Sequence, residues 1–288
     1  MRNAIIVTKA SGVTEPFQIG KLRHSLTRAR ASEDEIEYIL EMITPRLYSG
    51  ISTRKIYQEA FRLLRSKSMH HAARYNLKRG MLELGPTGFP FERFVSELFR
   101  ELGYGVEVDI KLPGKCVVHE VDVRATVDHE VILVECKYRN QAGIAVDVKT
   151  PLYIYARFQD LLDNGALQPQ QTFHGWIVTN AKFTVDAIAY GQCKSMNMLS
   201  WNYPADNSLK DQIDALGLYP LTCLTTLTQR EKQWLLERKY VLARDVCNQP
   251  ELLRRAGVRD SRLPKVAHEG ARLCKPGPQK TMPEEKPL

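Results

Sequence analysis

The sequence of 288 residues lacks any long apolar run. No stretch approaches about 20 apolar residues without a charge, so we expect no membrane span. The start, Met1 to Lys9, has too short an apolar run for a secretory signal. The six cysteines are scattered and form no C-x-x-C pair, which argues against a zinc site built on Cys pairs and against a disulfide framework. These absences predict a reduced, cytoplasmic protein.

Several catalytic motifs are also missing. No G-x-x-x-x-G-K-[ST] occurs, so a P-loop motor is disfavoured. The seven histidines form no H-x-x-x-H or H-x-H pattern, so we assign none of them to a metal. What is present is ordinary for a soluble globular protein, with 43% hydrophobic and 26% charged residues. The length fits one large domain or two to three small ones.

The formal net charge of +8 is unevenly distributed along the chain. Lys+Arg and Asp+Glu number 15 and 8 in residues 1–85, 12 and 17 in 86–220, and 14 and 8 in 221–288. A Pro/Gly cluster at 85–90 and Pro220 mark boundaries that agree with these shifts. We therefore predict four parts, namely 1–85, 88–204, 220–262 and a Pro-rich tail, 263–288, expected to be disordered.

The first part is predicted to be a small β-hairpin followed by a helical bundle. Two short β-branched segments, Ile5–Lys9 and Val13–Phe17, flank a turn that contains Gly12. Apolar residues then recur at helical spacing, and Ser52 or Thr53 suits the N-cap of one helix. The apolar positions that share a face are Leu22, Leu26 and Ala29, then Ile36, Ile39, Leu40 and Ile43, then Ile56, Ala60, Leu63 and Leu64.

Three motifs in this part carry a resemblance. They are Val7-Thr8-Lys9-x-x-Gly12-x-x-Glu15-Pro16-Phe17 with Lys21-Leu22, Gly50-Ile51-Ser52-Thr53-x-x-Ile56, and Ala73-Arg74-Tyr75. In order and spacing they resemble the ATP-cone domain of ribonucleotide reductases and of their nucleotide-sensing repressor. The resemblance implies regulatory binding of ATP or dATP without hydrolysis. It assigns Lys9 and Lys21 to the phosphates and Glu15 and Thr53 to further nucleotide contacts.

Lysines near a hairpin turn suit a triphosphate, which needs point charges. Without the resemblance, Lys9 and Lys21 would be interpreted as solvated surface lysines. One departure matters, because the family usually has Lys-Arg in the hairpin and Ala10 follows Lys9 here. One phosphate contact is therefore missing, and nucleotide binding is expected to be weaker or lost.

The middle part is predicted to be an α/β domain with a mixed sheet. Apolar residues from Phe91 to Leu102 follow a helical period, and Pro90 suits the first turn. Strands are expected at 106–112, 117–126, 131–138, 172–179 and 198–201, and helices at 146–162 and 184–196. The first of these two helices carries Tyr153, Tyr155, Arg157 and Phe158. For these four residues we favour packing in the core over contact with DNA.

Two of the predicted strands carry acidic and basic residues. Strand side chains alternate, so Glu135 and Lys137 share a face, and Asp122 can meet Glu135 if the two strands pair. Two close carboxylates need a compensating cation, and Mg²⁺ suits oxygen ligands. Alternatively, Glu135 and Lys137 could form an exposed ion pair worth under about 1 kcal/mol. The apolar run Ile132-Leu133-Val134 argues against a fully solvated strand.

Asp-x(n)-Glu-x-Lys in this context resembles the PD-(D/E)xK nuclease superfamily. The flanking patterns resemble its Mrr-type restriction endonuclease domain over residues 88–204; they are Phe91-Glu92-Arg93-Phe94-Val95, Leu102-Gly103-Tyr104, Trp176-Ile177-Val178-Thr179-Asn180 and Asp186-Ala187-Ile188-Ala189-Tyr190. The departures are Val121 in place of the nominal Pro and Cys136 between Glu and Lys.

This second resemblance implies Mg²⁺-dependent hydrolysis of phosphodiesters. Asp122 and Glu135, with the Cys136 carbonyl, would hold the metal. Lys137 would orient the attacking water or help to deprotonate it. Glu92 matches a further acidic position and would complete the metal shell, and Gln141 is a weaker candidate.

The third part, 220–262, is predicted to form short helices with interleaved basic residues. It resembles a helix-hairpin-helix DNA-binding unit, although Lys239 stands where that motif usually has glycine. A helical cap without DNA contacts is an equal alternative. The basic residues are Arg230, Lys232, Arg238, Lys239, Arg244, Arg254 and Arg255.

Together these patterns predict a nucleotide-regulated, Mg²⁺-dependent DNA endonuclease, as a homodimer or higher oligomer. The alternative is an ATP- or dATP-sensing DNA-binding protein whose nuclease-like domain is inactive. A third interpretation is a Holliday-junction-type resolvase, which would need a dimer and a preference for branched DNA.

Overall fold

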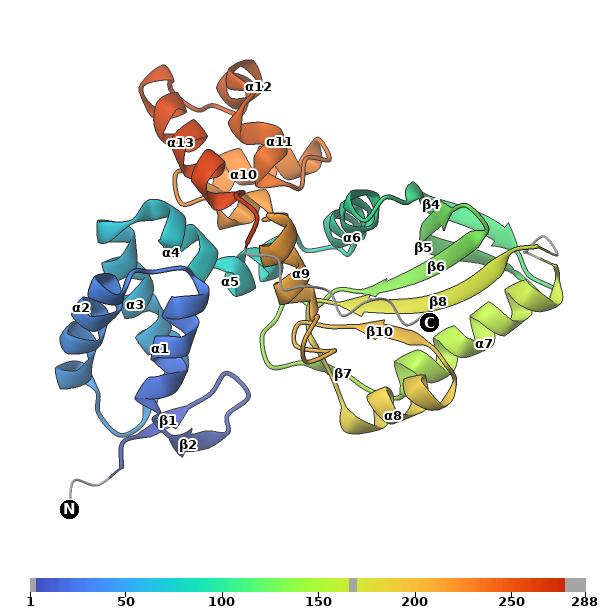
Figure 1. Cartoon of the computed structure of the whole chain (residues 1–288), viewed down its shortest axis with the longest axis horizontal. Helices are drawn as coiled ribbons and strands as arrows, with labels where there is room; N and C mark the ends of the chain where they lie inside the picture. Colours follow the sequence, from blue (N-terminus) through green and yellow to red (C-terminus); the bar gives the residue numbers. More distant parts are fainter. Residues whose placement is uncertain (1–3, 166–169, 278–288) are drawn as a thin grey trace. The chain divides into compact units, whose positions relative to one another are not determined.

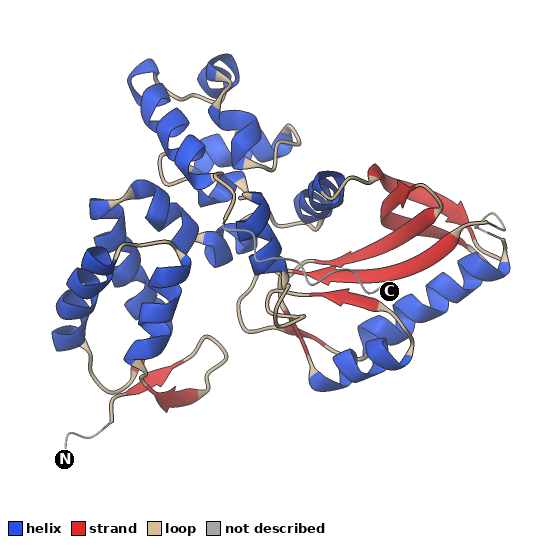
Figure 2. Cartoon of the chain, viewed as in Figure 1, coloured by secondary structure: helices blue, strands red, loops and turns tan. Residues whose placement is uncertain are grey.

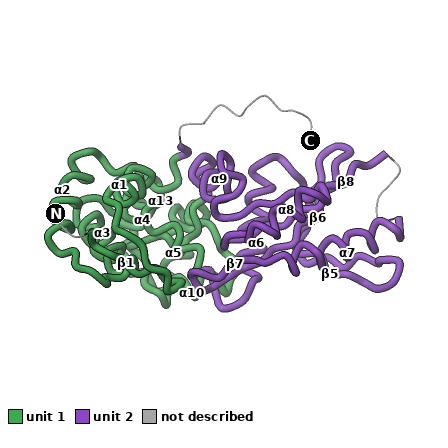
Figure 3. Tube along the Cα trace, turned by 90° about the horizontal axis from the view of Figure 1, so that it is seen from below, with its two compact units in different colours: residues 1–83, 219–275 green, residues 84–218, 276–288 purple. Residues whose placement is uncertain are grey.

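A computed structural model describes residues 4–165 and 170–277 (Figure 1). The described residues form two compact units, 4–83 with 219–275 and 84–218 with 276–277 (Figure 3). Both 4–83 and 219–275 therefore contribute to the first unit, although 1–85 and 220–262 were predicted to be separate parts. The middle of the chain forms the second unit.

The N-terminal half of the first unit contains the hairpin and helices that the sequence predicted. Strand β1 (Ile6–Thr8) pairs antiparallel with β2 (Thr14–Pro16) and parallel with β3 (Ile51–Ser52). The helices are α1 (Ile19–Arg28), α2 (Glu33–Ile43), the 3-10 turn η1 (Thr44–Arg46), α3 (Thr53–Lys67), α4 (Met69–Tyr75) and α5 (Leu77–Leu82).

Local sequence explains where these helices begin and which face they bury. The Ser32 side chain accepts from the Glu35 N–H, and Glu35 accepts in return, so α2 starts with a capping box. Of the two N-cap candidates for α3, Ser52 caps the helix by accepting from the Lys55 N–H. All of the apolar positions that were predicted to share helix faces lie in one core.

The C-terminal half of the first unit consists of short helices. They are η2 (Leu221–Cys223), α10 (Gln229–Glu237), α11 (Ala243–Cys247), α12 (Pro250–Arg255), η3 (Asp260–Arg262) and α13 (Leu263–Leu273). Helix α13 corrects the expectation that disorder begins at residue 263. Pro264 occupies the first turn, where proline is favourable, and Val266, Gly270 and Leu273 are buried. Residues 278–288 of the expected tail lie outside the described residues.

Arg74, at the end of α4, joins the two halves of the first unit. It is 6% exposed, and its guanidinium donates to Tyr219 Oη (3.3 Å) and to the carbonyls of Arg272 (2.8 Å) and Lys275 (3.2 Å). Gly80 in α5 permits a close approach nearby, because a Cβ there would lie 2.6 Å from Cys223 Sγ. The halves therefore share buried contacts.

The second unit is built on a five-stranded sheet in the order β10-β8-β6-β5-β4. Figure 2 draws its strands in red. Antiparallel pairing joins β4 (Gly105–Pro113), β5 (Val118–Val127) and β6 (Glu130–Lys137). Parallel pairing adds β8 (Thr172–Thr179) and β10 (Asn197–Leu199). The mixed sheet and its strand positions follow the sequence prediction.

Helices cover both faces of this sheet. On one face lies α6 (Phe89–Glu101), whose Phe99 contacts Trp176 of β8 edge to face. On the other lie α7 (Lys149–Asp163) and α8 (Val185–Cys193), and Ile154 and Phe158 share a core with Leu133 of β6. The remaining elements are the parallel pair β7 (Ala145–Val146) with β9 (Lys182–Phe183), and α9 (Leu209–Leu216). No helix among the described residues is long and apolar enough to cross a membrane.

Candidate active site

The charged residues of the predicted site lie on two central strands of the second unit. Strand β6 runs between β5 and β8, and its apolar residues Ile132, Leu133 and Val134 are buried. Glu135 and Lys137 follow directly, at the end of the strand. The core thus fixes the backbone from which both side chains project. Asp122 lies on β5, one residue beyond the pair Val123–Val134 at which the β5–β6 ladder ends.

Hydrogen bonds tie these side chains into one network. Oδ2 of Asp122 accepts from the main-chain N–H of Cys136 (2.6 Å). The Glu135 carboxylate accepts from Lys137 Nζ at Oε1 (2.5 Å) and from Arg157 Nη1 at Oε2 (2.7 Å). The structure therefore brings together Asp122, Glu135 and Lys137, and it adds a cation from α7.

Arg157 is the residue that sequence reasoning missed at this site. We expected it to pack in the core, but its guanidinium reaches Glu135 from α7. A signal existed in the sequence, because Arg157 lies in step with the buried Ile154, Phe158 and Leu161. An arginine on an otherwise apolar helix face needs hydrogen-bond acceptors, such as a carboxylate, on the element that it covers.

The site holds more carboxylate charge than its cations balance. Burial first and the neighbouring Glu135 charge second raise the pKa of Asp122 to about 7, against the opposing effects of the Cys136 N–H and Lys137. Burial also raises the pKa of Glu92 to about 7, with contributions from Asp122 and Asp109. Glu92, in the first turn of α6, therefore lies within electrostatic reach of the site, and its place in a metal shell stays a prediction. Asp109 was not predicted.

The donors at this site are oxygens. Asp122 and Glu135 offer carboxylates, and the Cys136 main chain offers a carbonyl, whereas burial raises the pKa of the Cys136 thiol well above its usual value. Such a set fits a hard cation such as Mg²⁺. The described residues contain no group of three or more His, Cys, Asp and Glu side chains that could hold a metal, so main chain or water would have to complete the shell. Gln141 lies exposed in the segment between β6 and β7.

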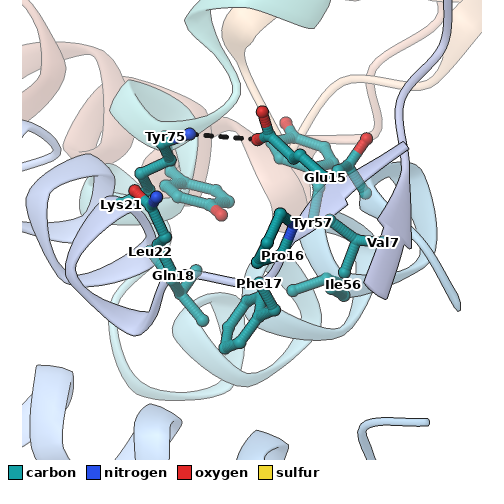
Figure 4. A pocket seen from close by; sticks show the side chains of 11 residues that line it. Val7, Glu15, Pro16, Phe17, Gln18, Lys21, Leu22, Ile56, Tyr57 and Tyr75 are labelled. Atoms are coloured by element: carbon teal, nitrogen blue, oxygen red, sulfur yellow. Dashed lines mark hydrogen bonds and ion pairs between the residues drawn. The ribbon is translucent and has the colours of Figure 1, made fainter. Parts of the chain in front are cut away.

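The first unit contains a separate cavity where the nucleotide-binding residues were predicted (Figure 4). Its volume is about 150 Å³, and its lining includes Glu15, Lys21 and Thr53. Glu15 pairs with Lys9 Nζ (2.5 Å) and with Lys21 Nζ (3.0 Å), and these two lysines, Lys9 first, lower the pKa of Glu15. All four predicted residues therefore lie at or beside one cavity.

Aromatic side chains form part of the same cavity wall. Tyr57 and Tyr75 both line it, and their rings stack with centroids 4.9 Å apart. Tyr75 belongs to one of the motifs quoted above, whereas Tyr57 was missed. The signal for Tyr57 is its position beside Ile56 in the first turns of α3, close to the N-cap. The cavity thus combines charged residues with a stacked aromatic pair.

The C-terminal half corrects one of the predicted basic contacts. Lys232 is buried, and its Nζ donates to the Thr222 carbonyl (2.7 Å), so it serves the fold and does not face a partner. Lys239 has a φ of 69°, in the left-handed region that favours glycine. The substitution noted from the sequence therefore stands at a position with glycine-like backbone geometry. Arg238 lies over the ring of Trp234, 3.6 Å from its centroid.

Comparisons with known proteins match one segment in each of the two units. A family model described as restriction endonuclease matches residues 86–202, and one described as AF1548-like, C-terminal, matches residues 219–274. An uncharacterized protein of Archaeoglobus fulgidus is 31% identical over 180 residues, which are 62% of this chain and 99% of that protein.

Two solved structures are also similar. The crystal structure of AF1548, a protein of unknown function, is 29% identical, with a TM-score of 0.54 over 65% of this chain and 98% of that one. The MspJI restriction endonuclease in complex with a 27-mer oligonucleotide is 16% identical, covers 54% of this chain and 34% of that one, and has a TM-score of 0.28. Residues 86–202 form a restriction endonuclease-like domain, and the chain belongs to the family of the uncharacterized Archaeoglobus protein.

Proposed function

We propose that this protein is a nucleotide-regulated, Mg²⁺-dependent DNA endonuclease, acting in restriction or in DNA processing. The observation that carries the proposal is the meeting of Asp122, Glu135 and Lys137 at the end of β6, within a restriction endonuclease-like domain. Hydrolysis of a phosphodiester requires a nucleophilic water and stabilisation of the charge that develops on the phosphate. These residues are of the types that supply both.

Each side chain has a defined role in this mechanism. Asp122 and Glu135, with the Cys136 carbonyl, would hold Mg²⁺, which when bound lowers the pKa of a water and neutralises charge on the phosphate. Lys137 Nζ would orient that water or accept its proton, and would face the developing negative charge. Glu92, whose pKa is raised to about 7 by burial first and by Asp122 next, would complete the metal shell through water.

DNA cleavage in the presence of Mg²⁺ tests this proposal. Linear, supercoiled, methylated and branched DNA are each incubated with the wild-type protein, with and without ATP or dATP. Asp122→Ala and Lys137→Ala should abolish cleavage and leave DNA binding largely intact. Glu130→Ala, on the exposed start of β6, is the matched control and should cut normally. A wild-type protein that cuts none of these substrates contradicts the proposal.

The same panel separates the alternatives. A nucleotide-sensing DNA-binding protein with an inactive site would bind DNA and cut none of it. A resolvase would cut only branched DNA and would be a dimer, which size-exclusion chromatography reveals.

The regulatory ligand is also a proposal, and the cavity of the first unit supports it. Lys9 and Lys21 offer cations for phosphates, and Tyr57 and Tyr75 offer aromatic surface for a base. We propose ATP or dATP as that ligand. At about 150 Å³ the cavity would hold part of a nucleotide, with the remainder exposed. The absence of a second basic residue at Ala10 predicts weak binding.

A further inference from the structure

We propose that Arg157 is a positioning residue that fixes the orientation of the Glu135 carboxylate for metal binding. This inference rests on the proposed Mg²⁺ site. Arg157 Nη1 donates to Glu135 Oε2 at 2.7 Å, and its Nη2 donates to the main-chain carbonyl of Glu120. One guanidinium on α7 therefore contacts a metal-ligand candidate on β6 and the backbone of the neighbouring strand β5.

The Glu135 carboxylate keeps acceptor capacity for a metal ion beside these donors. Lys137 Nζ occupies Oε1 and Arg157 occupies Oε2, so each oxygen accepts from one cation. A carboxylate has about four lone-pair sites, and one on each oxygen stays available. Arg157 can thus hold the plane of the carboxylate while Glu135 binds a metal. The planar fork of arginine reaches both acceptors, whereas the single ammonium of a lysine reaches one at a time.

Burial makes this orientation well defined. The Glu135 side chain is 7% exposed and that of Arg157 is 15% exposed. The backbone of α7 does not depend on their ion pair, because Ile154, Phe158 and Leu161 already hold the helix in the core. Replacement of Arg157 should therefore change the direction of Glu135 more than the fold. Partners that orient metal ligands typically matter by about 10–100-fold in metal affinity or activity.

The experiment is an Mg²⁺ titration of the full chain with two readouts, the melting temperature and the DNA cleavage rate. For Arg157→Ala we expect the half-maximal Mg²⁺ concentration to rise about tenfold or more in both readouts. At saturating Mg²⁺ the cleavage rate should return to within about threefold of wild type. Arg157→Lys should recover part of the Mg²⁺ response. Arg100→Ala, which removes an exposed Arg–Glu ion pair in the same unit, is the control and should not change it.

The outcomes separate this inference from the proposed function. If the wild-type protein responds to Mg²⁺ and cuts DNA, but Arg157→Ala has the wild-type Mg²⁺ dependence, the positioning role alone is overturned. A rate that stays low at every Mg²⁺ concentration, equally in Arg157→Ala and Arg157→Lys, indicates a merely structural role and also overturns it. If the wild-type protein neither responds to Mg²⁺ nor cuts, the metal-dependent function is overturned and the inference with it.

Discussion

The main-chain N–H of Cys136 donates a hydrogen bond of 2.6 Å to Oδ2 of Asp122. The regular ladder between β5 and β6 ends just before it, at Val123 and Val134. This bond therefore continues the connection between the two strands through a side chain. It also sets the Asp122 carboxylate beside the main chain of Cys136, next to Glu135. The arrangement concentrates negative charge in the second unit.

Replacement of Asp122 by Asn should change how stability depends on pH. The folded-state pKa of Asp122 is raised from 3.8 to about 7, chiefly by burial and then by Glu135. Protonation therefore favours the folded state, so this stabilisation is complete below about pH 4 and is lost as the pH rises through 7. In EDTA, Asp122→Asn should lose less stability between pH 4 and 8 and should melt a few degrees higher than wild type at pH 8.

Thermal unfolding across this pH range is the measurement. Asp206→Asn, in an exposed loop, is the control and should follow the wild-type profile. A residual slope in Asp122→Asn is expected from Glu92, whose pKa is also raised to about 7 by burial and Asp122. Identical profiles for wild type and Asp122→Asn would show that the pKa of Asp122 is not raised in the folded state.

Nucleotide binding should stabilise the first unit. Millimolar ATP or dATP should raise the melting temperature, because a ligand that binds only the folded state stabilises it. Lys21→Ala should reduce the shift, since Lys21 lies at the cavity. Ala10→Arg should increase it by supplying a second cation in the hairpin.

Lys67→Ala is the matched control for the nucleotide experiment. Thr53 at the start of α3 lines the cavity, whereas Lys67 lies at the opposite end of that helix and does not line it. It should leave the ATP-dependent shift unchanged. If neither wild type nor Ala10→Arg shifts with ATP or dATP, the regulatory assignment is wrong.

Loss of Arg74 should destabilise the first unit. Its guanidinium satisfies two carbonyls at the end of α13 as well as Tyr219 Oη. A buried acceptor left without a partner costs about 1–3 kcal/mol. Arg74→Ala should therefore lower the free energy of unfolding by roughly that amount, measured by denaturant titration. Arg79→Ala removes an exposed ion pair with Glu83 and should change it by under about 1 kcal/mol.

Removal of α13 should lower the stability of the first unit, whereas removal of a disordered tail would not. Val266, Leu273 and the Glu269 carboxylate are buried, and Glu269 accepts from the N–H and hydroxyl groups of Thr225 and Thr226. A chain that ends at residue 262 should be less stable than a chain that ends at 277, by several degrees in melting temperature. Equal melting temperatures for the two would contradict the role of α13 in the core.

Local patterns predicted many of the helices and strands. Helical spacing identified the buried faces of α2 and α3, and β-branched runs identified the strands. The prediction of a disordered tail from residue 263 was wrong because it relied on a composition rich in proline and charge. It overlooked Pro264, which favours a first helical turn, and the apolar spacing of Val266 and Leu273.

The sequence by itself determined that Glu135 and Lys137 would project from the end of a buried strand. An apolar run followed by charged residues leaves few other arrangements for a strand. Only the tertiary structure decided that Arg157 reaches Glu135 and that Arg74 joins α4 to α13. These contacts join residues far apart in the chain, and they depend on how helices pack against a sheet or against each other. Periodicity tells which face of an element is buried, but it does not tell which charged side chains meet there.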